Sequence, residues 1–374
     1  MANLASMLPS VPKSLGRLSD AYLSAYLALG TADNPLKLPM RKSYLFILVD
    51  GLGVSNIKSA GGHANFLNQK LKSSKSLFSG FPATTTSSLT SLATGKSNGD
   101  HAVLGHRVYD RPLEQNINFL NDLGTDLDPR KYQDLETISE LAAREGVLVS
   151  TIGPAEYDRS GFTMATMPNA KYIAASSFEE RFKAAQRALA APNSLTYLYF
   201  PEFDQLAHRF GANSQNWLNA IEELDAELAK FSRSLSSNSG VVLTADHGII
   251  DVLADKHIYL DEYECFDDLE QIGGDPRVSF LYFPSGVNLL QKREEITNLI
   301  GGICHVATVA ELVDSGWLAK LSTQAASVAP DLVLLPSADR VAYHRGFAKA
   351  RSLLMVGQHG GMMQAEWEVP LIVF

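Results

Sequence analysis

The chain has 374 residues, of which 45% are hydrophobic and 20% charged, with a formal net charge of -9. These are ordinary values for a globular protein, so they exclude a chain that is disordered throughout. No long run of lysine and arginine offsets the negative charge, which argues against binding a nucleic-acid polymer through its phosphates. The length predicts two domains, or one large α/β core that carries an insert.

The cysteines and the N-terminal stretch bear on the compartment. Cys265 and Cys304 lie far apart and lack the CxxC spacing of a thiolate zinc site. The opening stretch MANLASMLPSVPKSLGRLSD lacks a basic start followed by an apolar run, and nowhere do about 18 apolar residues occur together. We therefore expect a soluble cytoplasmic protein with reduced thiols, no signal peptide and no membrane span.

Short apolar runs alternate along the chain with segments of helical periodicity, which is the pattern of a parallel sheet covered on both faces. The predicted strands are 44–49, 147–152, 195–200, 241–244, 278–283, 332–335 and 371–374. One helix is predicted from an N-cap at Asp134 to a stop at Gly146. A second helix places apolar side chains on one stripe, namely Trp217, Ile221, Leu224, Leu228 and Phe231.

The rhythm changes after Asp251 to short strands and turn residues, including the sequence GGDPR at 273–277, and the earlier pattern returns only near His359. This change predicts a small α+β subdomain at 256–345. The catalytic core then consists of residues 1–255 plus 346–374.

The first chemical motif is an apolar strand that ends in a carboxylate followed by glycines, in the sequence LFILVDGLG with Asp50. In open α/β sheets ligands bind beyond the carboxyl ends of strands, where Asp50 stands. One alternative is an ordinary helix cap. The other is a dinucleotide-binding loop, which is disfavoured because Asn56 occupies the position of the third glycine.

The next motif is FPATTTSSLTSLATG at 81–95, in which hydroxyl residues surround Leu89 and Leu92 and Gly95 ends the run. It predicts a short helix that begins near Thr85. Free backbone N–H groups at such an N-terminus attract phosphate, so the hydroxyl of Thr85 is the candidate nucleophile. The alternative is that Thr84 or Thr85 merely caps the helix.

Three later motifs carry histidine: Asp204 and His208 four residues apart, the pair Asp246 and His247 after a strand, and His359 between glycines. Spacing of four places the first pair on one helix face. Any one of these motifs alone is more often structural than catalytic. Together with Asp50, three aspartates and three histidines match the ligand set of zinc and suffice for two open sites. Two such ions form a clamp on a phosphoryl group.

These blocks, in this order from Tyr44 to Phe374, resemble the alkaline phosphatase superfamily, and within it the type I phosphodiesterase / nucleotide pyrophosphatase family. The resemblance implies a three-layer α/β/α core with a mostly parallel sheet. It also implies one ion bound by Asp204, His208 and His359, and another bound by Asp50, Asp246, His247 and the nucleophile. The family's fixed distance to the glycine of LATG identifies the nucleophile as Thr85 rather than its neighbours.

The resemblance also implies three substrate-binding positions. Thr86 stands where family members carry an aromatic ring that packs on a nucleobase, whereas Tyr199 retains the aromatic residue expected on the other side. His106 lies near the position of a family asparagine that donates to the phosphoryl oxygen, and a plain surface role is the alternative. A nucleoside should therefore bind loosely.

The resemblance thus predicts a hydrolase of small phosphodiesters or pyrophosphates that uses two divalent ions, best matched by zinc, and a phosphothreonine intermediate. No oligomeric state is predicted. Two alternatives on the same fold are a phosphomonoesterase and a metal-dependent phosphomutase, and a third is a non-catalytic metal-binding scaffold. Phosphomutases of this kind usually carry a serine nucleophile and a large lid, which Thr85 and the short insert disfavour.

Overall fold

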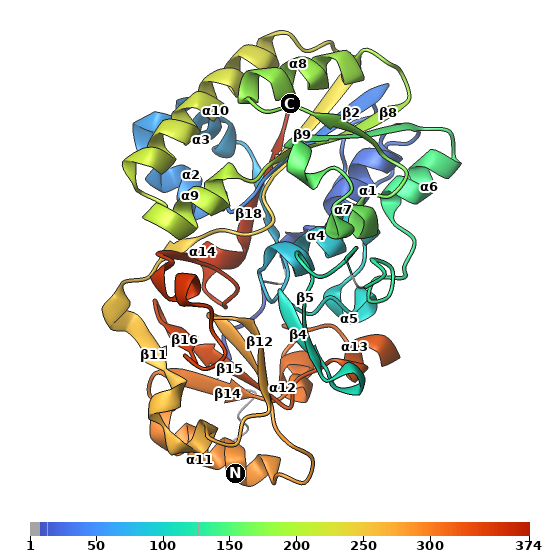
Figure 1. Ribbon diagram of the computed structural model, residues 1–374. Coiled ribbons are helices and arrows are strands. Elements are labelled where there is room, and N and C mark those ends of the chain that lie inside the picture. The colour runs from blue at the N-terminus through green and yellow to red at the C-terminus, as the bar shows by residue number, and fades with distance from the viewer. Residues whose placement is uncertain (1–7, 13, 126) are drawn as a thin grey trace.

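The computed structural model describes residues 8–12, 14–125 and 127–374. Its centre is an eight-stranded sheet in which only β18 runs antiparallel to its neighbours (Figure 1). In spatial order the strands are β1 (Gly16–Arg17), β3 (Lys75–Phe78), β18 (Glu368–Val373), β9 (Ser239–Thr244), β2 (Ser43–Val49), β8 (Ser194–Phe200), β6 (Leu148–Gly153) and β7 (Lys171–Ala174).

Helices lie on both faces of this sheet (Figure 1). One face carries α1 (Ser19–Leu27), α4 (Thr85–Thr94), α6 (Ile138–Arg144) and α7 (Gly161–Thr166), and α5 (Asn98–His101) follows α4. The other face carries α2 (Val54–Ser59), α3 (Asn65–Leu71), α8 (Phe178–Leu189), α9 (Glu202–Phe210) and α10 (Gln215–Arg233). The predicted α/β class with a mostly parallel sheet is confirmed.

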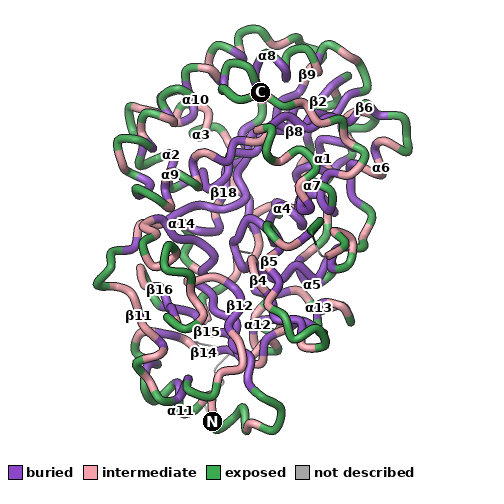
Figure 2. The backbone as a smooth tube through the Cα atoms, in the orientation of Figure 1, coloured by how far each residue is buried: buried purple, intermediate pink, exposed green. Residues whose placement is uncertain are grey.

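The central strands are buried because helices cover both of their faces, as the band of buried backbone in Figure 2 shows. Every residue of β2 is buried, which is why this strand reads as a continuous apolar run rather than an alternating one. The predicted apolar stripe of helix α10, from Trp217 to Phe231, is buried in the main hydrophobic core. Within the described residues, no helix is both long and apolar enough to cross a membrane.

The predicted start of the helix before Gly146 is wrong. Asp134 is exposed, and α6 begins only at Ile138 with Thr137 as its N-cap. The hydroxyl of Thr137 accepts from the N–H of Glu140, and the Glu140 carboxylate accepts from the N–H of Thr137. This reciprocal capping box satisfies two backbone donors, whereas a single cap at Asp134 would satisfy one. The predicted stop is confirmed, since Gly146 has a φ of 80°.

A second, antiparallel sheet contains β12 (Gln271–Asp275), β13 (Val278–Tyr282), β15 (Leu332–Pro336) and β14 (Cys304–Ala307). The helices α11 (Leu289–Ile300), α12 (Val309–Asp314) and α13 (Thr323–Ser327) accompany this sheet. One of its faces has its own apolar cluster, which includes Phe266, Leu281 and Leu334. The other face packs into the main core through Phe280 and Val333. The division at 256 and 345 stays a prediction.

Three short strand pairs and one helix complete the chain. They are β4 (Arg107–Asp110) with β5 (Gln115–Asn118), β10 (Ile250–Asp251) with β17 (Gly357–Gln358), β11 (His257–Tyr259) with β16 (Val341–Tyr343), and α14 (Gln364–Trp367). Antiparallel pairing of β10 with β17 joins the segment that carries His359 to the segment that follows Asp246 and His247.

Candidate active site

The topology brings all of the predicted ligands to one edge of the main sheet. Strands β2, β8 and β9 are parallel, so the segments that follow them emerge at the same edge. The segment that precedes the antiparallel strand β18 must lie at this edge too, and so does the segment that follows β3. These segments carry Asp50, Asp204, His208, Asp246, His247, His359 and Thr85.

The seven side chains meet in one cluster. The Asp204 Oδ1 atom lies 3.2 Å from His208 Nε2 and 3.7 Å from His359 Nε2. The His247 Nε2 atom lies 3.4 Å from Asp50 Oδ1 and 3.4 Å from Asp246 Oδ2. The Thr85 hydroxyl oxygen is 3.1 Å from the same His247 nitrogen. The imidazole rings of His247 and His359 stack with their centroids 3.7 Å apart.

Buried carboxylate oxygens in this cluster lack hydrogen-bond partners among the described residues. They are Asp50 Oδ1, Asp204 Oδ1 and Asp246 Oδ2. A buried charged oxygen without a partner is costly unless a cation satisfies it. Two overlapping sets, one of Asp204, His247 and His359 and one of Asp50, Asp246 and His247, have ligand atoms within 4.8 Å of one another. The donor set therefore fits two divalent cations, with His208 beside the first set.

The histidines are oriented as metal ligands usually are. The Nδ1 atom of His208 lies 2.7 Å from the Gly357 carbonyl oxygen, and that of His359 lies 3.0 Å from the Ala83 carbonyl oxygen. Because a carbonyl oxygen only accepts, Nδ1 carries the proton in both rings, and the Nε2 lone pair faces Asp204. Burial and the neighbouring histidines His247 and His208 hold the pKa of His359 well below its usual value, which keeps its imidazole neutral.

The electrostatics of the aspartates also favour a cation. Burial raises the pKa of Asp50 well above its ordinary value, and the charges of Asp246 and Asp204 raise it further. Its second carboxylate oxygen accepts a hydrogen bond from the Tyr199 hydroxyl. Positive charge placed between these carboxylates would relieve both the burial cost and the mutual repulsion.

The position of Thr85 follows from its helix. Thr84 is extended, with φ of -125°, and precedes α4, so Thr85 is the first helical residue. The helix ends at Gly95, whose φ of 67° is left-handed, as the sequence predicts. The first N–H groups of a helix have no partners within it. Thr85 thus stands where free N–H donors meet the carboxylate and histidine cluster.

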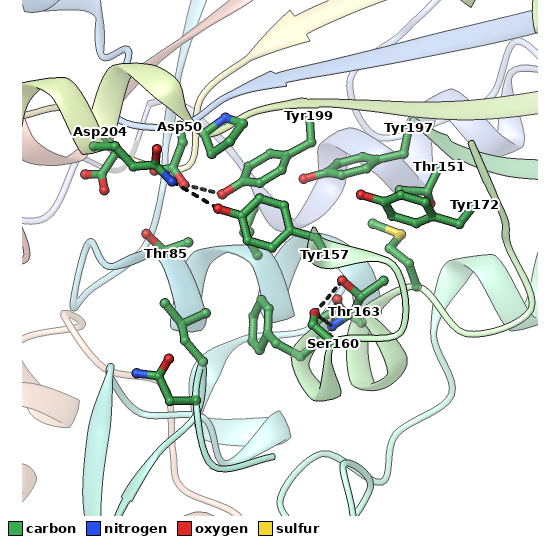
Figure 3. A pocket seen from close by; sticks show the side chains of 18 residues that line it. Asp50, Thr85, Thr151, Tyr157, Ser160, Thr163, Tyr172, Tyr197, Tyr199 and Asp204 are labelled. Carbon is green, nitrogen blue, oxygen red and sulfur yellow. Dashed lines mark hydrogen bonds between the residues drawn. The ribbon is translucent and has the colours of Figure 1, made fainter. Parts of the chain in front are cut away.

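A cavity of about 330 Å³ opens beside Thr85, Asp50 and Asp204 (Figure 3). Tyr199 lines it, and its role in substrate binding stays a prediction. Thr86 does not line it, because this side chain is fully buried on another side of α4. His106 does not line it either. His106 instead lies close enough to His208 and Asp204 for their charges to influence its pKa, which burial lowers.

Most residues that line the cavity belong to none of the sequence motifs. Its other lining residues include Thr151 and Tyr172 from β6 and β7, Tyr197 from β8, and Tyr157 and Phe162 from the segment around α7. Tyr197 and Tyr199 are two residues apart in a strand, so both lie on one face, and this pattern indicates Tyr197 as a lining residue. The others come from segments without a motif. The strand register brings Thr151 and Tyr172 beside Tyr197, and the segment that follows β6 carries Tyr157 and Phe162.

Comparisons with known proteins agree with this architecture. A model of the type I phosphodiesterase / nucleotide pyrophosphatase family matches residues 44–361. No curated protein matches the chain significantly. Murine ectonucleotide pyrophosphatase / phosphodiesterase 5 superposes with a TM-score of 0.69 at 17% identity, over 88% of this chain and 87% of that chain.

Two further solved structures are similar. An inactive threonine-to-alanine variant of the same murine protein, in complex with AMP, has a TM-score of 0.69 at 16% identity, over 88% of this chain and 87% of that chain. Phosphonoacetate hydrolase from Sinorhizobium meliloti, in complex with phosphonoformate, has a TM-score of 0.67 at 18% identity, over 90% of each chain. At these identities the structural likeness shows the fold.

Proposed function

This chain belongs to the type I phosphodiesterase / nucleotide pyrophosphatase family of the alkaline phosphatase superfamily, and we propose that it hydrolyses small phosphodiesters or pyrophosphates through a phosphothreonine at Thr85. The observation that carries the proposal is the cluster itself. Six potential metal ligands surround a hydroxyl at a helix N-terminus, 3.1 Å from His247. The inactive variant of the murine neighbour, which lacks a threonine, supports the assignment of the nucleophile.

The ligand assignment follows the family. Asp204, His208 and His359 would hold one divalent cation, and the other would be held by Asp50, Asp246 and His247. Bound ions, of which zinc best matches this donor set, would neutralise charge on the phosphoryl oxygens and favour the deprotonated threonine hydroxyl.

The chain's own groups then divide the remaining work. The Thr85 oxygen attacks phosphorus in line, and a bond from phosphorus to Oγ1 forms as the bond to the leaving oxygen breaks. The departing alcohol or phosphate takes a proton from solvent. Water then attacks phosphorus, the bond from phosphorus to Oγ1 breaks, and the phosphoryl product and free Thr85 are released. The free N–H groups of α4 bind a phosphoryl oxygen. His106, beside His208, would donate a further hydrogen bond from its neutral ring.

The charge of the cavity supports diesters over monoesters. Its lining includes no lysine, arginine or histidine, and its charged members are Asp50 and Asp204 of the proposed metal sites. A monoester dianion carries one more negative charge than a diester and gains most from an added cation. A phosphonate that also bears a carboxylate, as phosphonoacetate does, would lack a cationic partner in this cavity too.

The test is a substrate panel on zinc-loaded protein, with 4-nitrophenyl phosphate, a 4-nitrophenyl nucleotide diester, a dinucleoside pyrophosphate and phosphonoacetate. We expect kcat/KM for the diester or the pyrophosphate to exceed that for the monoester by about tenfold or more, the effect of one unmatched charge. A higher kcat/KM for the monoester would reassign the protein to the phosphomonoesterases. Failure of the metal-loaded protein to cleave any of the four would refute the proposal.

A further inference from the structure

A row of three side chains on neighbouring strands of the main sheet lines the cavity next to the proposed catalytic cluster. In the strand register Thr151 of β6 pairs with Tyr197 of β8 on one side and with Tyr172 of β7 on the other. Directly paired residues project from the same face of a sheet. All three line the cavity, and Figure 3 shows Thr151 and Tyr172 at the end away from Asp204 and Thr85.

Two hydroxyls of this row are free to bind a ligand. The Thr151 hydroxyl oxygen is buried and has no hydrogen-bond partner among the described residues. The Tyr197 hydroxyl also makes no hydrogen bond within that part of the chain, although only 5% of the residue is exposed. By contrast, the Tyr172 hydroxyl donates to the Pro154 carbonyl oxygen at 2.6 Å. Buried polar groups are normally paired, so the Thr151 hydroxyl needs a partner from outside the chain. The Tyr197 hydroxyl, in the same cavity, is available to that partner.

The rest of the wall limits what this partner can be. Leu89 of α4 and Phe162 and Met167 of the α7 segment supply apolar surface. Tyrosine rings form much of the remaining wall, and the rings of Tyr197 and Tyr199 stack with their centroids 6.2 Å apart. No lysine, arginine or histidine contributes to the wall. A charged group at the far end would be desolvated without a counterion, which is strongly unfavourable.

Building on the proposed function, we infer that the cavity binds one organic group of the substrate, and that this group is an uncharged ring with a hydrogen-bonding substituent at its far end. Thr151 and Tyr197 are the specificity-determining residues for that substituent. The ring packs between the tyrosines and the apolar wall, while the phosphorus lies at Thr85. The cavity therefore selects a neutral head group and excludes a charged one.

The test separates binding from turnover. Zinc-loaded Thr85→Ala protein is titrated calorimetrically with three diesters that share a 4-nitrophenyl group and differ in the other ester group: phenyl, 4-(hydroxymethyl)phenyl or 4-carboxyphenyl. We expect the hydroxymethyl compound to bind about three- to tenfold more tightly than the phenyl compound, the worth of one hydrogen bond. The carboxyphenyl compound should bind at least about tenfold more weakly than the phenyl compound.

Variants then assign the effect to the row. In the background of Thr85→Ala, Thr151→Val with Tyr197→Phe should bring the two neutral compounds within about twofold of each other. Ser150→Ala is the matched control, because Ser150 is the adjacent residue of β6 and bonds to Thr196 on the opposite face. It should retain the preference.

Equal binding of the neutral pair by the Thr85→Ala protein, or tightest binding of the carboxylate, would overturn the inference without any variant. Turnover by the unmutated enzyme is measured on the same diesters. If none is cleaved although the binding preference holds, the proposed function fails and the assignment of the cavity stands. If the diesters are cleaved without a preference, the inference alone fails.

Discussion

Thr85 is the residue at which binding and chemistry can be separated. Its hydroxyl faces His247 at 3.1 Å, and His247 and five further side chains supply the potential ligand atoms around it. Thr85→Ala should lower kcat for a nitrophenyl diester by about a thousandfold or more, the usual cost of losing a nucleophile. The bound zinc, measured by elemental analysis, should stay close to two equivalents per chain because the six side-chain ligands remain.

Thr85→Ser provides the control for this prediction. Serine keeps the hydroxyl and removes only a methyl group, so a measurable fraction of the activity should return. Trapping with a labelled substrate and acid quench should yield phosphate on the threonine of the parent enzyme and none on the alanine variant. An alanine variant that turns over at the parent rate would eliminate the covalent mechanism.

His101 makes a separate prediction about acid stability. Burial lowers the pKa of His101 to about 3. The geometry agrees, because the Val103 N–H donates to its Nδ1 and the Ser91 hydroxyl lies 2.9 Å from its Nε2. The neutral ring therefore carries its proton on Nε2, and a second proton would displace the bond from Val103.

The sign of the effect follows from linkage. Unfolded histidine takes up a proton below about pH 6.5, whereas folded His101 does not until about pH 3. Its contribution to stability is therefore complete above pH 6.5 and is lost as the pH falls, by up to about 1.4 kcal/mol per pH unit. Between about pH 7.5 and about pH 5, His101→Gln should lose less of its unfolding midpoint than the parent. Parallel losses would contradict the assignment.

At the scale of residues, the sequence predicts the ligands far better than the cavity. Asp50, Asp246 and His247 follow apolar runs that are recognisable as strands, and the edge of a parallel sheet then brings them together. Thr151 and Tyr172 carry no such signal, because their proximity to Tyr197 depends on which strands are neighbours and in which register. Thr86 is a predicted substrate-binding residue only through the family resemblance; its side chain is buried and does not line the cavity, and its role stays a prediction.

At the scale of elements, an ion pair joins the second sheet to the loop that carries His359. Arg277, in the turn between β12 and β13, donates from Nε and Nη2 to the two carboxylate oxygens of Glu366 in α14, at 2.9 Å and 2.7 Å. The side chains are 1% and 0% exposed. The same carboxylate accepts from the N–H groups of Gly361 and Met363. A Cβ atom at Gly361 would lie 2.7 Å from this carboxylate, which explains the glycine.

Breaking this pair should affect stability and metal binding together. Arg277→Met leaves Glu366 charged and buried without its partner, at a cost of about 3 to 5 kcal/mol. The Glu366 carboxylate, which accepts from the loop at Gly361 and Met363, then loses the partner that fixes its position, so zinc affinity should fall by about tenfold or more. Calorimetric unfolding and competition with a zinc chelator measure the two effects.

Arg345→Met is the matched control. Arg345 pairs with Asp261 and Glu262 outside the main sheet, and its side chain is 47% exposed. Its loss should cost less than about 1 kcal/mol, because solvent screens such a pair, and zinc affinity should not change. Equal effects of the two variants would mean that the buried pair does not position His359.

The elements also show where local signals suffice. The end of α4 follows from Gly95, whose left-handed conformation acts locally. Its start near Thr85 is also as predicted, although the N-cap Thr84 makes no side-chain capping hydrogen bond. The predicted N-cap of α6, Asp134, comes before the observed N-cap, Thr137. Two candidate caps compete here, and the capping box of Thr137 and Glu140 provides more hydrogen bonds. No local pattern predicts the antiparallel direction of β18, because this direction depends on pairing with strands that are distant in the sequence.

At the scale of the whole molecule, the proposed metal cluster should cost folding free energy when no cation is bound. Three carboxylates at one edge of the sheet each have a buried oxygen. Burial raises the pKa of Asp50, and the charges of Asp246 and Asp204 raise it further. Ligands that bind only the folded chain stabilise it by mass action, by about 2.7 kcal/mol per site at one hundred times the dissociation constant. Zinc should therefore raise the unfolding midpoint by several degrees, and a chelator should reverse the rise.

The variant Asp50→Asn should have a higher unfolding midpoint than the parent without metal, and zinc should raise this midpoint less than that of the parent. Asparagine retains an oxygen that can accept from Tyr199 but removes one of the mutually repelling charges, so the metal-free variant should unfold at a higher temperature than the metal-free parent. The same substitution removes an anionic ligand, so the variant should gain much less from zinc. The exposed Asp255→Asn, outside the cluster, should follow the parent in both states. Calorimetry of the three proteins with chelator and with zinc distinguishes a metal centre from a structural carboxylate network. In a structural network Asp50→Asn would lower the midpoint in both conditions, because the native interactions of the carboxylate would be lost without any metal dependence.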